Sequence, residues 1–232
     1  MNLRRRMKTW LYAIYWRGGY KSTGEEETWA KRVQPIFLRD QGLKPHHNFL
    51  DIGCGYLRGT LELVDYLEEG RFFGIDVSSS NIRRAKERVS RQCNNRPNLI
   101  AGSLLGISRF WPTVKFDFVL AASVFTHLWP AEIEGCLQQV ERVLNENGKF
   151  FATVFKDNTV SKYDGWCGSC INHTLETHPS PKSVTRRRNY LFLNFCYNTL
   201  WISEVAKKCK LEVREIGPTE IGQFMLEIKR TD

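Results

Sequence analysis

The sequence predicts an α/β fold: a doubly wound, mainly parallel sheet of seven strands that ends in an antiparallel C-terminal hairpin. Three observations predict it. Between residues 48 and 155, short apolar runs alternate with amphipathic stretches, which is typical of parallel strands joined by helical crossovers. A glycine-rich turn directly follows the first apolar run. After residue 210, two strand-like runs are separated only by a short turn, so we expect them to pair antiparallel.

Size and composition agree with a globular domain. The chain has 232 residues, of which 42% are hydrophobic and 25% charged. This is enough sequence to bury the core of one large domain or two small ones. The composition excludes a disordered tail protein, a collagen-like repeat and a disulfide-rich miniprotein. No apolar run approaches the roughly 20 residues that a helix needs to cross a bilayer, so we expect no transmembrane segment.

The elements of the first two thirds follow from capping signals and periodicity. A helix is predicted from about Thr23 to Arg39, because Thr23 can cap it and three glutamates follow in its first turn. Pro35 disfavours the second half of this helix. Hydrophobic periodicity then predicts strands over residues 48–52, 72–76, 99–101, 116–121 and 149–155. Helices are predicted over residues 57–67, 81–89 and 130–144, the last ended by Asn147-Gly148.

The last third begins with a break in this pattern. Residues 157–190 carry turn-formers and polar residues without a period, which is long for a connection inside a compact domain. A helix is then predicted over residues 198–209, followed by strands over 212–216 and 224–229, with Gly217-Pro218 and Gly222 in the turn between them.

Domain organisation and charge follow the same division. We expect an N-terminal basic and aromatic arm with a cap helix over residues 1–44, and one domain over residues 45–232 with an insertion at 157–190. The net charge is +9, of which residues 1–21 contribute +6 and residues 156–190 contribute +3. The remaining residues carry 22 basic and 22 acidic side chains. Anionic partners are therefore expected at the two basic segments.

Cysteine usage and the N-terminus predict a cytoplasmic protein. The seven cysteines are an odd number, and most lie in apolar stretches where a thiol packs as a small hydrophobe. This favours a reducing compartment. Three arginines at residues 4–6 and the aromatic run at 10–16 resemble a signal peptide only faintly, because the small-residue cleavage site is missing. We expect this segment to be retained.

The motif that carries chemistry lies after the first predicted strand. Asp51-Ile-Gly53-Cys54-Gly55 places two glycines where the chain leaves a buried strand, so the backbone can approach a ligand closely. The second strand ends in Asp76, where an acid can accept the two hydroxyl groups of a ribose. A dinucleotide site would need glycine at position 58, which is arginine here, and would leave Asp51 without a role.

Asp-x-Gly-x-Gly instead resembles motif I of the class I S-adenosylmethionine-dependent methyltransferases, a Rossmann-like family. The resemblance covers about residues 23–230. It includes Phe73–Ser78 as the strand-2 motif, Ala101–Ser103 as the adenine-side turn, Phe116–Leu128 as strand 4 with its turn, and Leu144–Phe151 as the entry to strand 5. Two positions depart from the family: Leu57 stands where a third glycine is frequent, and Ser103 where many members carry aspartate.

The resemblance implies S-adenosylmethionine as cofactor and S-adenosylhomocysteine as product. It also implies which residues contact the cofactor: Asp51, Gly53, Cys54, Gly55, Asp76, Val77, Ser103, Ala122 and Ser123. In this family the acid of motif I and the loop amides hold the amino-acid end of the cofactor, and the acid of strand 2 holds the ribose. Asp51 and Asp76 could instead cap helices, and Cys54 is expected to fill space between the glycines, not to act as a nucleophile.

His127 follows strand 4, where the substrate entrance of this family opens. Its imidazole is a candidate catalytic base, able to take a proton from an acceptor hydroxyl. The alternative is that it packs against or caps the helix that begins near Trp129-Pro130.

Two features of the insertion also have open interpretations. Cys167, Cys170, His173 and His178 have the residue types of a zinc site, but their spacing is irregular. We expect no metal there and favour an ordinary loop over zinc or a redox pair. Arg186, Arg187 and Arg188 lie in the segment that covers the acceptor in this fold. They are candidates for binding an anionic group of the substrate, and the alternative is a solvated charge run.

These features predict methyl transfer to an oxygen or nitrogen atom of a small-molecule or lipid-like acceptor. The acceptor can itself carry an anionic group. The turn at residues 121–124 lacks the Asn/Asp-Pro-Pro-aromatic sequence of enzymes that methylate bases at exocyclic amino groups. The first alternative is an RNA methyltransferase that uses the basic segments as a phosphate track. The second is a cofactor-binding module without catalysis. The N-terminal arm could form a lid, contact a membrane surface or stack on bases.

Overall fold

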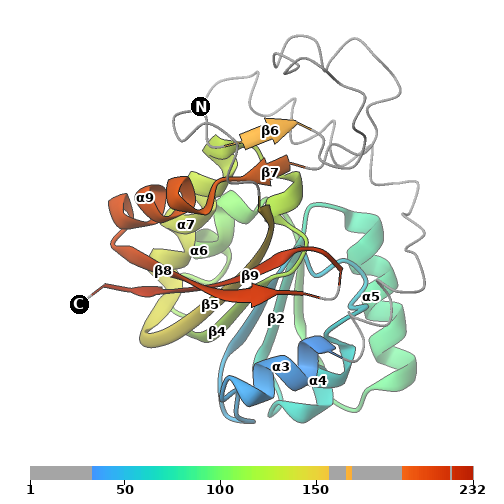
Figure 1. Ribbon diagram of the computed structural model, residues 1–232. Coiled ribbons are helices and arrows are strands. Elements are labelled where there is room, and N and C mark those ends of the chain that lie inside the picture. Colours follow the sequence, from blue (N-terminus) through green and yellow to red (C-terminus); the bar gives the residue numbers. More distant parts are fainter. Residues whose placement is uncertain (1–32, 157–165, 169–194, 220, 232) are drawn as a thin grey trace.

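The computed structural model describes residues 33–156, 166–168, 195–219 and 221–231. A twisted sheet forms its centre (Figure 1). Its main strands are β1 (Phe49–Ile52), β2 (Phe72–Asp76), β3 (Asn98–Ala101), β4 (Phe116–Ala121), β5 (Leu144–Lys156), β8 (Leu211–Pro218) and β9 (Phe224–Arg230). Strands β3, β2, β1, β4 and β5 lie side by side in that order and are parallel. The predicted doubly wound parallel sheet is therefore confirmed.

The C-terminal hairpin closes the sheet on the β5 side. Strand β9 pairs antiparallel with β5, and β8 pairs antiparallel with β9. Two short strands come in addition to the seven that the sequence predicts: β6 (Trp166–Gly168) and β7 (Phe195–Tyr197). Strand β7 pairs parallel with the last residues of β5, with Phe155 opposite Cys196, and β6 pairs antiparallel with β7. Together the described ranges contain nine strands in one sheet.

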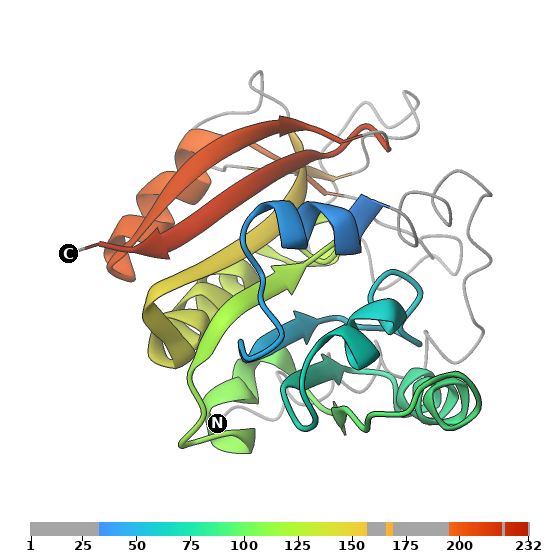
Figure 2. The same cartoon turned by 90° about the horizontal axis from the view of Figure 1, so that it is seen from below.

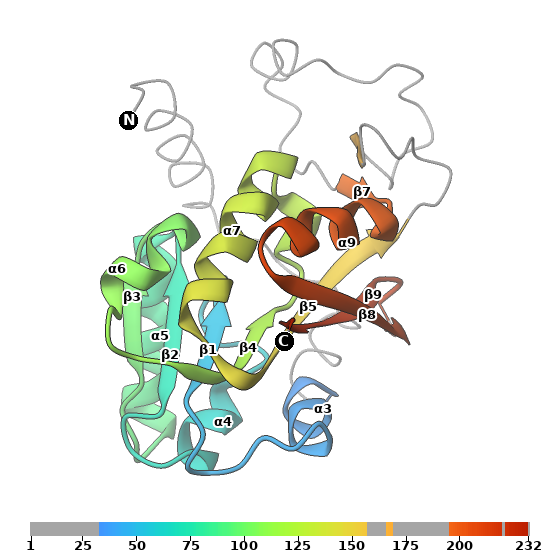
Figure 3. The same ribbon diagram turned by 90° about the vertical axis from the view of Figure 1, so that its left-hand side faces the viewer.

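Helices cover both faces of this sheet (Figures 1 and 3). On one face lie α3 (Gln34–Asp40), α4 (Leu61–Tyr66) and α5 (Ser79–Gln92). The other face is covered by α6 (Ile107–Phe110), α7 (Pro130–Val143) and α9 (Thr199–Lys208). Two single turns, η3 (Leu104–Gly106) and η4 (Phe125–His127), follow β3 and β4. Each face needs its own apolar core, because side chains alternate between the two sides of a strand.

Successive residues of the central strands supply these two cores. Phe150 packs in the cluster under α7 and α9, and Phe151 packs in the cluster under α3, α4 and α5. In β4, the successive residues Phe118 and Val119 belong to opposite clusters as well. Every residue of β1 and nearly every residue of β4 is buried, and apart from Asp51 and Asp117 both strands are apolar. This is the pattern of strands covered on both sides.

Most predicted boundaries are correct within two residues, and the exceptions have local causes. Helix α4 begins at Leu61 instead of residue 57, because Leu57 adopts a left-handed backbone with φ of 60°. Helix α7 ends at Val143, and Asn147-Gly148 lies within β5 instead of ending the helix. Gly217-Pro218 likewise lies within β8, where the register with β9 is irregular.

Helix α3 corrects the expectation for Pro35. The proline lies in the first turn of α3, where its missing N–H has no partner to lose, so the half that seemed disfavoured is helical. Phe37 packs edge-to-face on Phe151 at 5.0 Å between ring centroids, and Arg39 forms an ion pair with Glu62 of α4. In Figure 2, α3 (blue) lies over the sheet. Residues 23–32 of the predicted helix lie outside the described residues.

Several other predictions also fall outside the described part. These are the arm at residues 1–32 and most of the insertion at 157–190, of which only the backbone of β6 is described. Within the described part, no helix is long and apolar enough to cross a membrane. The thiols of Cys54, Cys93, Cys136 and Cys209 are free, whereas Cys196 takes part in a disulfide. The predicted reducing compartment stays a prediction.

Phe116 tests the packing of the core under α7. Its side chain is fully buried and packs edge-to-face against Phe73 and Trp111, at 5.1 and 6.0 Å between centroids. Phe116→Ala should therefore lower the free energy of unfolding by about 3–5 kcal/mol, as measured by urea denaturation. The matched control is Phe110→Ala, since Phe110 is 39% exposed, and its loss should stay near 1 kcal/mol or less, roughly. Equal losses in both variants would contradict this packing.

Candidate functional site

The candidate site lies at the carboxyl ends of β1, β2 and β4. The chain leaves β1 toward β2 on one side, and β4 lies on the other side of β1. The strand order therefore reverses between β1 and β4. Crevices at such reversal points are where open α/β sheets bind ligands. Three loops meet there, over residues 53–60, 77–78 and 122–127.

The loop after β1 depends on its glycines. Gly53 has φ of 70°, and its N–H donates to the carbonyl of Ile75 in β2 at 2.7 Å. A Cβ atom at Gly53 would come within 2.5 Å of a methyl group of Val124. Gly55 has φ of 55° and faces open space. The first glycine thus lets this loop touch the loop after β4, and the second leaves room beside the backbone.

Asp76 joins this loop to the start of α5. One carboxylate oxygen accepts the N–H of Gly55 at 2.9 Å, and the other accepts the N–H of Ser78 at 2.8 Å and the side chain of Asn81 at 3.3 Å. Burial raises the pKa of Asp76, and these hydrogen bonds oppose the rise. The oxygen that faces Gly55 has accepted one hydrogen bond and retains the capacity for another.

Asp51 lies in β1, behind the same loop. Its carboxyl group is buried and accepts a hydrogen bond from Thr60 at 2.6 Å on Oδ2. Its other oxygen accepts no hydrogen bond from the residues that the structure describes. Burial, with a smaller contribution from the charge of Asp76, raises the pKa of Asp51 to about 7. A cation placed beside Asp51 would stabilise its ionised form.

Cys54 lies between the two glycines with its side chain turned inward. It is 6% exposed, and burial raises the pKa of its thiol well above the ordinary value. A thiol held in the protonated form is a poor nucleophile. The geometry thus favours packing, as expected from the sequence.

The loop after β4 is held by residues that sequence analysis missed. Ser123 adopts a left-handed backbone with φ of 55°, and its N–H donates to the hydroxyl of Thr153 in β5 at 2.7 Å. Its own hydroxyl accepts a hydrogen bond at 3.0 Å from Nε2 of the buried Gln223, at the start of the last hairpin strand. The hairpin therefore fixes the turn that bounds the site. Ala122 is the half-buried residue before it.

Two neighbouring residues of η4 face different environments. His127 is half-buried and ends η4, with its N–H on the carbonyl of Val124 at 2.9 Å. The N-cap of α7 is Trp129, whose N–H donates to the side chain of Glu132 at 2.9 Å. The hydroxyl of Thr126 is buried and has no hydrogen-bond partner within the described ranges.

The remaining predicted site residues are only partly placed. Val77 and Ser103 are half-buried, and the hydroxyl of Ser103 accepts the N–H of Leu105 at 3.3 Å as the cap of η3. The three arginines 186–188 lie outside the described residues, as do Cys170, His173 and His178, and of Cys167 only the backbone is described. Among the described residues no cluster of three potential metal ligands is found.

Known proteins share this arrangement. Residues 50–150 match the family described as a methyltransferase domain. A probable methyltransferase, LtbC of Aspergillus luteorubrus, is 30% identical over 139 residues, which cover 56% of this chain and 48% of that protein. The human mitochondrial arginine-hydroxylase NDUFAF5 is 24% identical over 161 residues, which cover 66% of this chain and 42% of that protein. The chain thus spans about half the length of these curated relatives.

A solved structure extends the likeness to the whole fold. Magnesium protoporphyrin IX methyltransferase of Synechocystis PCC 6803, crystallised with S-adenosylmethionine, superposes with a TM-score of 0.64. The alignment covers 96% of this chain and 97% of that one at 12% sequence identity. Identity this low indicates a common fold and leaves the substrate open.

The raised pKa of Asp51 predicts a pH dependence of stability. From about pH 4 to about pH 7 the buried carboxyl stays protonated, while the same group in the unfolded chain has ionised. Raising the pH through this window therefore favours the unfolded chain, by up to about 1.4 kcal/mol per pH unit. Asp51→Asn should remove this contribution. Between about pH 5 and about pH 7, the free energy of unfolding of the variant should therefore fall less than that of the unchanged chain. Asp40→Asn, at an exposed acid, should retain the original slope. A slope that Asp51→Asn leaves unaltered would refute the assignment.

The contact between the two loops predicts a coupled pair of substitutions. Gly53→Ala should lower the unfolding free energy by about 1–3 kcal/mol, because its new methyl group meets Val124. Val124→Ala should recover part of that loss in the double variant, with a coupling energy of about 0.5–3 kcal/mol. The remaining loss reflects the left-handed backbone at Gly53, which no change at Val124 relieves. Strict additivity in urea denaturation would show that the loops do not touch.

Proposed function

We propose, from the match of residues 50–150 to the methyltransferase-domain family, that the chain is a class I S-adenosylmethionine-dependent methyltransferase that transfers a methyl group from S-adenosylmethionine to an acceptor. We further propose that the acceptor atom is an oxygen or nitrogen of a small-molecule or lipid-like compound. The observation that carries the proposal is a pair of acids, the buried Asp51 and the half-buried Asp76, joined by one glycine loop at the point where the strand order reverses.

The residues at this point fit the proposed cofactor. Asp76 has acceptor capacity left for a ribose hydroxyl beside Gly55. Asp51 has an oxygen without a hydrogen bond and a raised pKa, which is the environment that a positively charged ligand group would relieve. The open space at Gly55 leaves room for a ligand against the backbone. Ser103, Val77 and Ala122 would border the adenine and the reacting end.

When bound, S-adenosylmethionine supplies a methyl group on a positively charged sulfur, which is reactive toward nucleophiles. The contribution of the chain is then to orient the acceptor and exclude water. The turn at Ser123 is suited to this role, since Thr153 and Gln223 hold it from two different strands. His127, four residues further on, is proposed as the base that accepts a proton on its imidazole when the acceptor is a hydroxyl group.

The acceptor class rests on the sequence of the turn after β4. Residues 121–124 read Ala-Ala-Ser-Val and lack the prolines that enzymes acting on exocyclic amino groups of bases carry there. This supports a small molecule or lipid over a nucleic-acid base. The arginines 186–188 are proposed to bind an anionic group of that acceptor, which extends the same proposal to phosphorylated or carboxylated compounds.

Titration with S-adenosylhomocysteine tests the cofactor site. Asp76→Ala should weaken binding at least tenfold, since a hydrogen bond to a charged group contributes about 1.5–3 kcal/mol. Asp76→Asn keeps the shape of the side chain and part of its accepting capacity, so an intermediate loss is expected. Glu87→Ala removes an exposed acid of α5 and should bind as the unchanged chain does. Calorimetry measures all three, with circular dichroism to establish that each variant is folded.

A folded Asp76→Ala variant with unchanged affinity would overturn the site. For catalysis, His127→Ala should lower turnover and alter its pH profile while S-adenosylhomocysteine still binds. Native turnover in this variant would return His127 to a packing role. Tight binding by the unchanged chain without methyl transfer to any of a panel of phenol, amine, carboxylate and phosphorylated acceptors would favour a binding module over an enzyme.

A further inference from the structure

Three arginines gather around one aromatic ring beside the candidate site. The guanidinium carbons of Arg58, Arg84 and Arg88 lie 5.7, 4.2 and 5.7 Å from the centre of the Tyr56 ring. Arg84 and Arg88 are one turn apart on α5, and Arg58 belongs to the loop that leads into α4. We refer to Arg58, Arg84 and Arg88 as the arginine cluster.

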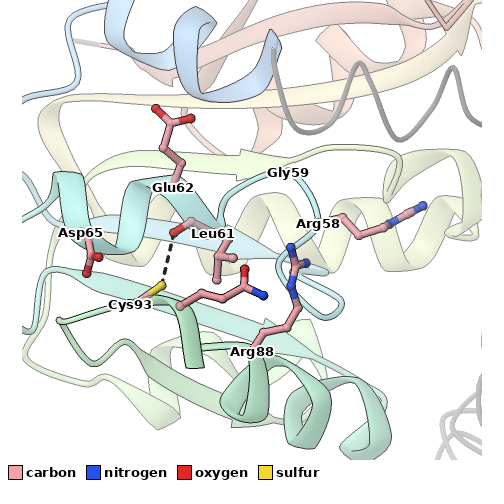
Figure 4. A pocket seen from close by; sticks show the side chains of 8 residues that line it. Arg58, Gly59, Leu61, Glu62, Asp65, Arg88 and Cys93 are labelled. Atoms are coloured by element: carbon pink, nitrogen blue, oxygen red, sulfur yellow. Dashed lines mark hydrogen bonds between the residues drawn. The ribbon is translucent and has the colours of Figure 1, made fainter. Parts of the chain in front are cut away.

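A pocket between α4 and α5 adjoins the cluster. Its volume is about 340 Å³, which lies within the size range of ligand pockets. Figure 4 shows Arg88 reaching from α5 toward the loop that carries Arg58, with Asp65 and Cys93 at the opposite end of the pocket. The wall next to the arginines is completed by Gly59 and Gln92.

No acid neutralises the arginine cluster within the described ranges. The two acids of the pocket have other partners: Glu62 pairs with Arg39, and Asp65 accepts the N–H groups of Asn94 and Asn95, both at 2.9 Å. Nη1 of Arg88 donates hydrogen bonds to the carbonyl oxygens of Tyr56 and Leu57, both at 3.2 Å.

Arg58 is the least satisfied member. Its Nη1 atom is buried and has no hydrogen-bond partner among the residues that the structure describes. A buried charged donor without a partner is unfavourable, and its two like-charged neighbours add repulsion. The face of the Tyr56 ring attracts the three cations, but a ring carries no charge and accepts no strong hydrogen bond. A dianion with several oxygens would accept hydrogen bonds from the unpartnered donor and would also neutralise the repulsion between the three cations.

We propose that the arginine cluster binds a phosphate group, carried either by a small molecule or by a lipid headgroup. Guanidinium groups present paired N–H donors that match phosphate oxygens. Arg58 and Arg88 line the pocket, and Arg84 lies over the same Tyr56 ring; three cations around one ring fit a single phosphate better than a long polyanion. The residues that line the pocket are different from those proposed to contact the cofactor, so this site does not depend on methyl transfer.

Titration of the whole chain with inorganic phosphate at low salt tests this site, followed by NMR signals of the arginine Nε–H groups. Arg58→Ala and Arg84→Ala should each weaken binding at least fivefold. Arg83→Ala is the matched control: it removes the same charge from the exposed surface of α5, next to Arg84 in sequence, and should change affinity less than twofold. Equal weakening in all three variants, or no saturable binding by the unchanged chain, would overturn the proposal.

Two further experiments distinguish a lipid headgroup from a small molecule and test whether RNA binds instead. Binding to phosphatidylcholine vesicles that contain phosphatidic acid, lost in Arg58→Ala but not in Arg83→Ala, would support a lipid headgroup; phosphate binding without vesicle binding would support a small molecule. If single-stranded RNA binds and the three variants weaken it equally, the surface is an extended polyanion track and the proposal fails.

Titration with S-adenosylhomocysteine separates the two sites. Competition between it and phosphate would assign the arginines to the cofactor site and overturn the proposal, whereas absence of cofactor binding alone would overturn only the proposed function.

Discussion

The carboxylate of Asp76 is the group on which the site depends. It ends β2 and accepts hydrogen bonds from the loop after β1 and from the first turn of α5. A buried carboxylate is tolerated only when its oxygens are hydrogen-bonded, so the loop at Gly55 and the start of α5 must come to it. The same requirement explains the positive φ of Gly55, because this backbone conformation lets the loop turn its N–H toward β2.

A second group of contacts connects the site to the distant end of the chain. Gln223 lies beside β9, yet its amide reaches the hydroxyl of Ser123 after β4. Ser123 is followed by Val124, whose methyl group fills the space that the missing side chain of Gly53 leaves. The C-terminal hairpin therefore supports the turn after β4, and this turn supports the loop of the proposed cofactor site.

Sequence patterns predicted the parts of this structure that depend on local or periodic signals. Strands β2 and β4 have the predicted limits, because burial on both faces makes each of them mainly apolar. The start of α4 could not be predicted, since nothing in the sequence shows that Leu57 is left-handed. Strands β6 and β7 were missed because each has three residues, too few for a period to be visible.

The candidate site shows the same division. Asp51, Gly53 and Asp76 could be found because they stand next to strands at a characteristic spacing. Thr60 and Gln223 could not, because their roles come from side-chain contacts that form only in the folded chain, in the case of Gln223 across 100 residues. The arginine cluster could not be predicted from the net charge of sequence segments either. Residues 22–155 carry no large excess of charge, yet the fold brings Arg58 next to Arg84 and Arg88 of α5.

We propose that two acids, the buried Asp51 and the half-buried Asp76, hold S-adenosylmethionine at the carboxyl ends of β1 and β2. Calorimetric titration of the intact chain with S-adenosylmethionine at pH 7, in two buffers of different ionisation enthalpy, tests it most directly. Since the pKa of Asp51 is about 7, a bound cation beside it should displace its proton. The account predicts saturable one-to-one binding with a heat that depends on the buffer because protons are released. The absence of saturable binding would contradict it.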